Sequence, residues 1–160
     1  MSDQLVAVDH SALKVNQATI ILLLLAAFII DQAALVALVS GVMLLGAAVN
    51  RPGFGLLYTH LLKPPGWVKP DVLRDHREPH RFAQGFGGAV LAASAALLWS
   101  GLPAVGWALS WLVTALAGLN LFAGFCMGCA MYYWFNRMKL PGFKKSPPAG
   151  VPAGMRPKAR

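Results

Sequence analysis

The sequence predicts an all-α integral membrane protein with four transmembrane helices, arranged as two hairpins. Of its 160 residues, 57% are hydrophobic and only 12% are charged, about half of the roughly 25% charged residues found in soluble domains. The mean hydropathy is +0.57. The net charge of +8 comes from residues between and after the apolar runs. This placement suits a lipid surface and argues against a nucleic-acid-binding face.

Four apolar runs are long enough to predict transmembrane helices. We expect them near residues 15–30, 33–49, 82–100 and 105–136. The polar pair Asp31–Gln32 separates the first two, although one steeply tilted helix over 15–49 is an alternative. Gly101–Pro103 separates the last two. We also expect a short helix in the membrane interface over residues 54–62, within the long loop 50–81.

Lysine and arginine placement predicts the orientation of the helices. The loop 50–81 and the segment after residue 136 carry nearly all of the basic residues, whereas the other two connections carry none. Because cytoplasmic loops are enriched in Lys and Arg, we expect both termini and the long loop in the cytoplasm. We expect one transmembrane domain over 1–143 and a basic, Pro-rich, disordered tail over 144–160.

A weak internal repeat suggests a duplicated hairpin. Asp9–His10 precedes the first hairpin, and Asp75–His76 precedes the second. The second helix ends at Asn50–Arg51, and the fourth ends at Asn136–Arg137. The repeat indicates either two parallel halves or residues that commonly mark cytoplasmic helix ends.

Cys126 and Cys129 are the two cysteines and the candidate reactive pair. Residues at i and i+3 share a helix face, so the thiols can cycle to a disulfide, carry a persulfide or bind a soft metal. On a continuous fourth helix they lie near the C-terminus, where the dipole disfavours a thiolate. A small-residue packing seam with Gly124 and Gly128 is the structural alternative.

Activation of the thiols would then require a nearby cation or a helix break at Gly124. Equal rise from the Pro103 turn places Cys126 opposite His80. We therefore expect a thiol to approach His80, Arg81 or Gln84, with Gln84 and Asn120 orienting the group that binds. His76 and His80 have the spacing of metal ligands, but the intervening Pro79 disrupts a shared helix face. We therefore expect no metal site from these two histidines.

Two motifs resemble a bacterial inner-membrane family that is catalogued only as a domain of unknown function. They are PHRFAQ at Pro79–Gln84, and GFCMGC at Gly124–Cys129 with Asn120 upstream. The resemblance covers roughly residues 8–136. It implies a four-span protein without an established activity. Relatives are often encoded near thioredoxin-like or rhodanese-like proteins, which suggests a partner of that kind.

The leading functional hypothesis is a thiol- or sulfur-handling membrane protein. Cys126 and Cys129 would exchange electrons or sulfane sulfur with a soluble cytoplasmic partner, and His80 and Arg81 would stabilise the thiolate. One alternative is a structural or accessory subunit of a membrane complex. Another is an oligomeric permease for a small anion or sulfur compound. The sequence identifies no cofactor, and it leaves open whether the protein is an enzyme or a homo-oligomer.

Overall fold

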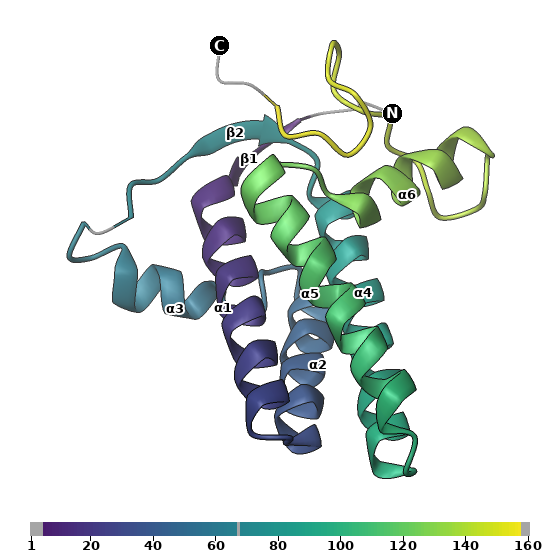
Figure 1. Cartoon of the computed structure of the whole chain (residues 1–160). Helices are drawn as coiled ribbons and strands as arrows, with labels where there is room; N and C mark the ends of the chain where they lie inside the picture. The colour runs from purple at the N-terminus through teal and green to yellow at the C-terminus, as the bar shows by residue number, and fades with distance from the viewer. Residues whose placement is uncertain (1–4, 67, 158–160) are drawn as a thin grey trace.

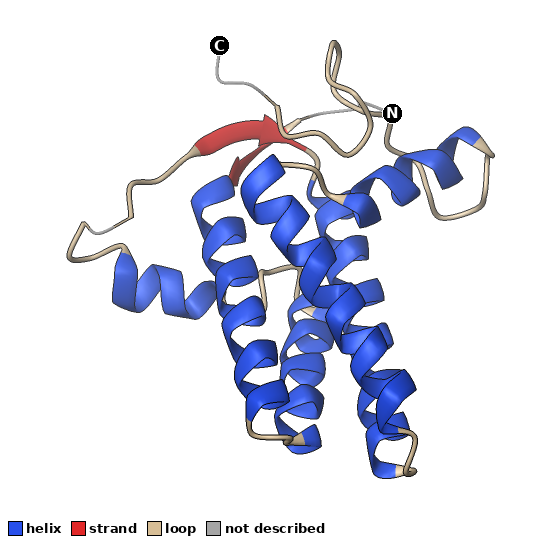
Figure 2. Cartoon of the chain, in the orientation of Figure 1, coloured by secondary structure: helices blue, strands red, loops and turns tan. Residues whose placement is uncertain are grey.

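Four long helices lie side by side and form the body of the molecule, with a two-stranded ribbon across one end (Figures 1 and 2). The computed structural model describes residues 5–66 and 68–157. The long helices are α1 (His10–Ile29), α2 (Ala33–Ala48), α4 (Arg77–Trp99) and α5 (Pro103–Ala123). Helices α1, α4 and α5 are long and apolar enough to cross a membrane, whereas α2 has 16 residues. The predicted helical membrane class is therefore confirmed at this level.

A tight turn separates α1 from α2, so residues 15–49 do not form one helix. Asp31 adopts a left-handed backbone conformation with φ of 50°, which ends α1. The hydrophobic core is formed by apolar side chains from α1, α2, α4 and α5. Ser40 of α2 donates a hydrogen bond to the Gly88 carbonyl of α4, and Ser94 of α4 donates one to the Gly106 carbonyl of α5. These bonds satisfy polar groups that lipid could not satisfy.

The ribbon is the part of the fold that an all-α prediction misses. Strand β1 (Val6–Asp9) pairs antiparallel with β2 (Val72–Asp75). Val6 lies opposite Asp75, and Asp9 lies opposite Val72. Each strand leads almost directly into a long helix, β1 into α1 and β2 into α4. The ribbon therefore connects the starts of α1 and α4, one at each of its two ends.

Both of these helices begin earlier than the apolar runs predict. Helix α1 starts at His10, and the Asp9 side chain caps it by accepting a hydrogen bond from the Ser11 amide at 3.0 Å. Helix α4 starts at Arg77 rather than residue 82. Pro79 is compatible with this start because a first-turn amide has no intrahelical acceptor. His80 consequently lies in the first turn of α4.

The predicted fourth helix over 105–136 is wrong, because the chain breaks at Gly124. Helix α5 ends at Ala123, and a separate helix α6 runs over Met127–Arg137 in a different direction (Figure 1). Gly124 adopts φ of 65°, a left-handed conformation that glycine accepts without steric cost and that commonly terminates helices. The break places Cys126 at the N-terminus of a helix instead of near a helix C-terminus.

The predicted short helix over 54–62 is present as α3 (Gly55–Leu57) and a π-helical turn, η1 (Tyr58–Leu62). The buried Tyr58 donates a hydrogen bond to Asp9 at 2.8 Å and so ties this segment to the start of α1. Its location in the membrane interface stays a prediction.

The C-terminal segment returns to the Gly124 break. The Cys126 amide donates to the Gly154 carbonyl at 2.8 Å, and the Arg156 amide donates to the Gly124 carbonyl at 3.0 Å. Arg156 also forms an ion pair with Asp71. The described residues 138–157 contain no helix or strand. The domain division at residue 143 stays a prediction.

Candidate functional site

Cys126 and Cys129 form a disulfide at the N-terminus of α6, with their Cα atoms 5.2 Å apart. Cys126 is the N-cap residue, and its Sγ accepts a hydrogen bond from the Cys129 amide at 3.1 Å. The expected location near a helix C-terminus is therefore wrong. A helix N-terminus offers unpaired amides and a positive dipole end, both of which stabilise a thiolate.

Close packing of α6 against α4 positions the pair. A Cβ atom added at Gly128, between the two cysteines, would lie 2.6 Å from the Cβ of Ala83 on α4. Only glycine permits this approach. At Gly128 the helices therefore pack closely, as the small-residue packing alternative predicts. It also brings the cysteines to the first turn of α4, so the seam serves the site.

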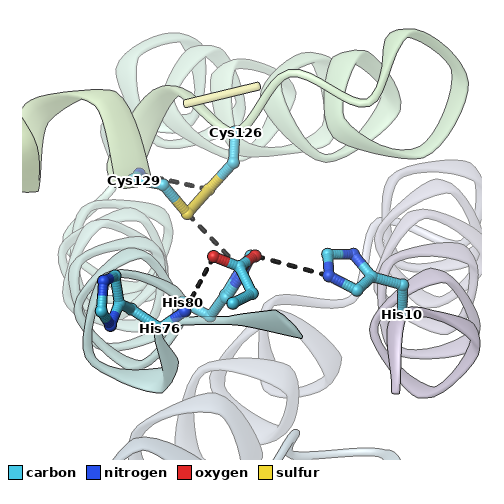
Figure 3. Close-up of a disulfide and its surroundings, with 6 residues drawn as sticks. His10, His76, His80, Cys126 and Cys129 are labelled. Carbon is cyan, nitrogen blue, oxygen red and sulfur yellow. Dashed lines mark hydrogen bonds and ion pairs between the residues drawn. A yellow bond between two sulfur atoms is a disulfide. The ribbon is translucent and has the colours of Figure 1, made fainter. Parts of the chain in front are cut away.

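His80 contacts the disulfide through Cys129, whereas the helix arithmetic placed Cys126 opposite it. Its Nδ1 lies 3.5 Å from Cys129 Sγ, and its Nε2 lies 2.9 Å from Asp75 Oδ2 (Figure 3). An ionised Asp75 can only accept hydrogen bonds, so it assigns the proton to Nε2 in the neutral imidazole. The Nδ1 lone pair then faces the sulfur. Asp75, His80 and Cys129 are thus arranged as orienting group, base and thiol.

Asp75 is the buried anion of the site. Its exposed fraction is 5%, and its Oδ1 accepts a hydrogen bond from the His76 amide at 2.8 Å. Burial alone would raise the pKa of Asp75, but interactions with His10 and His80 and the His76 amide together hold it well below the ordinary value. The carboxyl group is therefore ionised at neutral pH.

His10 reaches the same carboxylate from α1. It is 5% exposed, and its Nε2 lies 3.4 Å from Asp75 Oδ2 without a hydrogen-bond partner among the described atoms. Its ring meets the His80 ring edge-on, with centroids 5.7 Å apart. Sequence reasoning missed Asp75 and His10 as site residues. The repeated Asp–His pair was their only signal, because the β1–β2 pairing that joins them is a long-range contact.

A cavity of about 260 Å³ opens onto the disulfide. Its walls come from α1, α5, α6 and the C-terminal segment. Its polar lining includes the side chains of His10, Lys14, Gln17, Asp75, His80, Asn120 and Arg156. The cavity thus combines the disulfide, two cations, a carboxylate and neutral hydrogen-bonding groups at one place.

The other predicted site residues divide into two groups. Asn120 lines the disulfide cavity, as expected of an orienting group. Arg81 is exposed and lines a separate cavity beside Arg51 and Arg77. Gln84 donates hydrogen bonds to the carbonyls of Met43 and Arg51 at 2.9 and 3.3 Å. It therefore ties α4 to the end of α2, and its hydrogen bonds hold the fold.

The sequence matches a known family over nearly the whole helical region. Neither the curated proteins nor the solved structures give a match to the chain. The family model matches residues 8–137, which include every cysteine, histidine and aspartate of the site. This chain therefore belongs to the family described as Domain of unknown function (DUF4395).

Proposed function

We propose that the protein is a membrane-embedded thiol–disulfide exchange protein, in which Cys126 and Cys129 pass two electrons to or from a soluble partner. The observation that carries the proposal is the contact between Cys129 Sγ and His80 Nδ1, with His80 held by the buried Asp75. A packing cysteine needs no base, and a base held by a buried carboxylate is the arrangement that activates thiols elsewhere.

The exchange step follows from these positions. A partner thiol attacks Cys126 Sγ, and His80 Nδ1 takes the proton of that thiol. The Cys126–Cys129 bond breaks, Cys129 Sγ receives its electron pair, and His80 passes the proton to it. The partner's second thiol then attacks the mixed disulfide and releases Cys126. The partner loses two electrons and two protons, and the cysteine pair gains both. The reverse sequence oxidises the pair.

The two cysteines have different roles in this scheme. Cys126 caps α6, so its thiolate receives the Cys129 amide and the helix dipole. That stabilisation suits the sulfur that forms the mixed disulfide. Cys129 is 3% exposed and faces His80, which suits the sulfur that leaves and returns with a proton. Thiol exchange requires a thiolate attacker and favours a stabilised leaving thiolate.

The proposed setting is a bacterial inner membrane crossed four times. In this topology α2 crosses the membrane in addition to α1, α4 and α5 and is the shortest of the four spans. The two hairpins are parallel copies. The register of the ribbon supports the duplication, because it is symmetric. Asp9, the last residue of β1, lies opposite the first residue of β2, and Asp75, the last residue of β2, lies opposite the first residue of β1. The ribbon and α6 lie at one end of the bundle (Figure 1). We place that end in the cytoplasm.

The proposed partner is a cytoplasmic thioredoxin-like or rhodanese-like protein. The site already holds a segment of this chain, because residues 154–156 line the disulfide cavity. Gly154–Arg156 pairs with the backbone at Gly124 and Cys126. This segment lies over the disulfide cavity, so a macromolecular partner must displace it or approach beside it. In transfer of sulfane sulfur, the reduced Cys126 thiolate would attack the outer sulfur of the partner's persulfide, keep that sulfur as its own persulfide and release the partner's thiolate.

The first test separates His80 from its neighbour Arg81. In the reduced protein, His80→Gln should slow alkylation of Cys129 about tenfold at neutral pH, because this thiol loses the base beside it. Arg81→Gln is the matched control, because the Arg81 side chain lines a different cavity. The measurement is alkylation rate against pH, with peptides read by mass spectrometry. Equal rates in His80→Gln and wild type, with the fold intact, would leave the cysteines as packing residues.

The second test concerns the C-terminal segment. A side chain at Gly154 would meet Ala130 and the Cys126 carbonyl at 2.8 Å, whereas one at Gly150 would meet nothing within 4 Å. Both glycines have positive φ, near 80°, so Gly150→Val controls for backbone strain. Gly154→Val should increase the rate at which a soluble phosphine reduces the disulfide several-fold. Equal reduction rates in the two variants would contradict a covering role for this segment.

The third test fixes the orientation of the helices. In a Cys126→Ser, Cys129→Ser background, Ser100→Cys should react with a membrane-impermeant maleimide added outside intact cells, and Lys63→Cys should react only after permeabilisation. Both positions are exposed; Ser100 directly follows α4, whereas Lys63 lies in the connection between α2 and α4. The basic-loop asymmetry motivates this result. Labelling with the opposite sidedness would place the cysteine pair outside the cytoplasm.

A further inference from the structure

We propose that His10, Asp75 and His80 form a binding site for a divalent transition-metal ion, with Zn²⁺ as the ion to test. The candidate ligand atoms of the three residues lie within 4.8 Å of one another. They come from α1, β2 and α4, and the ribbon holds these elements together. This inference is independent of the cysteine chemistry, because none of the three ligands is a thiol.

The spacing of the ligand atoms suits a tetrahedral ion. With bonds of about 2.0–2.1 Å to each ligand, neighbouring ligand atoms in a tetrahedral zinc site are separated by about 3.3 Å. His10 Nε2 lies 3.4 Å from Asp75 Oδ2, and His80 Nε2 lies 2.9 Å from the same oxygen. Of these two separations, only the second must widen, as its hydrogen bond is replaced by coordination. The candidate atoms of His10 and His80 lie within 4.8 Å of each other.

An unsatisfied nitrogen points to a missing ligand. His10 Nε2 is buried and lacks a hydrogen-bond partner among the described atoms, although it faces a carboxylate oxygen. A buried polar atom without a hydrogen-bond partner destabilises the fold. Metal coordination would remove that destabilisation. The third histidine, His76, orients the carboxylate through its backbone amide, as the outer groups of metal sites do.

The chemistry of the ligands selects the class of ion. Two imidazoles and one carboxylate suit zinc and other first-row transition metals. Magnesium and calcium instead require six or more oxygen ligands. The disulfide cavity borders all three residues, so a water or a substrate group can take the fourth position. This is the pattern of three protein ligands and one open position that catalytic zinc sites show.

Metal binding and proton transfer would use His80 differently. A metal on Nε2 leaves the proton on Nδ1, so the ring then donates toward Cys129 Sγ instead of accepting from it. The same ion breaks the Asp75–His80 hydrogen bond. The ion would therefore alter the base proposed for Cys129, while the disulfide remains outside the coordination sphere. Sequence spacing pointed to His76 as the partner of His80, and the structure supplies His10 and Asp75 instead.

The experiment measures zinc binding to the full-length protein in detergent, with the disulfide intact. Equilibrium dialysis against a competing chelator, followed by elemental analysis, should give one Zn²⁺ per chain. His10→Gln and Asp75→Asn should each weaken binding at least about tenfold, since even outer-shell changes reach that size. His60→Gln is the matched control, because His60 is exposed on η1. The Cys126→Ser, Cys129→Ser variant should bind as wild type does.

Three results would overturn the proposal. They are less than stoichiometric zinc in the folded wild type, unchanged affinity in His10→Gln and Asp75→Asn, and loss of binding in the double cysteine variant. If the ligand variants fail to fold, Co²⁺ added to the wild type decides. It should give tetrahedral d–d bands without a thiolate charge-transfer band, and their absence would also refute the site. Redox exchange measured with a chelator present tests the proposed function separately.

Discussion

The hydrogen bond between His80 Nε2 and Asp75 at 2.9 Å is the interaction on which the site depends. It fixes the imidazole so that the opposite nitrogen faces Cys129 Sγ. Asp75 can hold this position because it ends β2, two residues before α4 begins, and β2 pairs with β1, which leads into α1. A short ribbon thus connects residues far apart in the sequence to a single buried carboxylate.

Two glycines allow the disulfide to lie close to this carboxylate. Gly124 takes a left-handed conformation that ends α5, and Gly128 allows α6 to lie against Ala83. The break converts the cysteines from helix-interior residues into an N-terminal cap, which reverses the sign of the helix-dipole effect on their thiolates. The same glycines that suggest a packing seam are therefore the means by which the fold presents a reactive bond.

Sequence reasoning predicted the local features and missed the long-range ones. Apolar runs gave the four long helices, and counting along the hairpin gave the approach of His80 to the cysteines. The runs could not show where α1 and α4 begin, because their first turns are polar and Pro79 reads as a breaker. The prediction of a continuous fourth helix was wrong because the helix ends at a single residue, Gly124, whose positive φ the apolar pattern does not reveal. Asp75 and His10 needed the strand pairing, which short polar-flanked strands barely signal.

The central claim is that Cys126 and Cys129 interconvert between dithiol and disulfide in the folded protein. Its most direct test equilibrates the detergent-solubilised protein with glutathione redox buffers, traps free thiols by alkylation and scores both residues by mass spectrometry. The account predicts one two-electron transition in which both cysteines change together, at a potential between about −320 and −120 mV, the range of protein and cellular thiol couples. A pair that stays in one form across that range would contradict it.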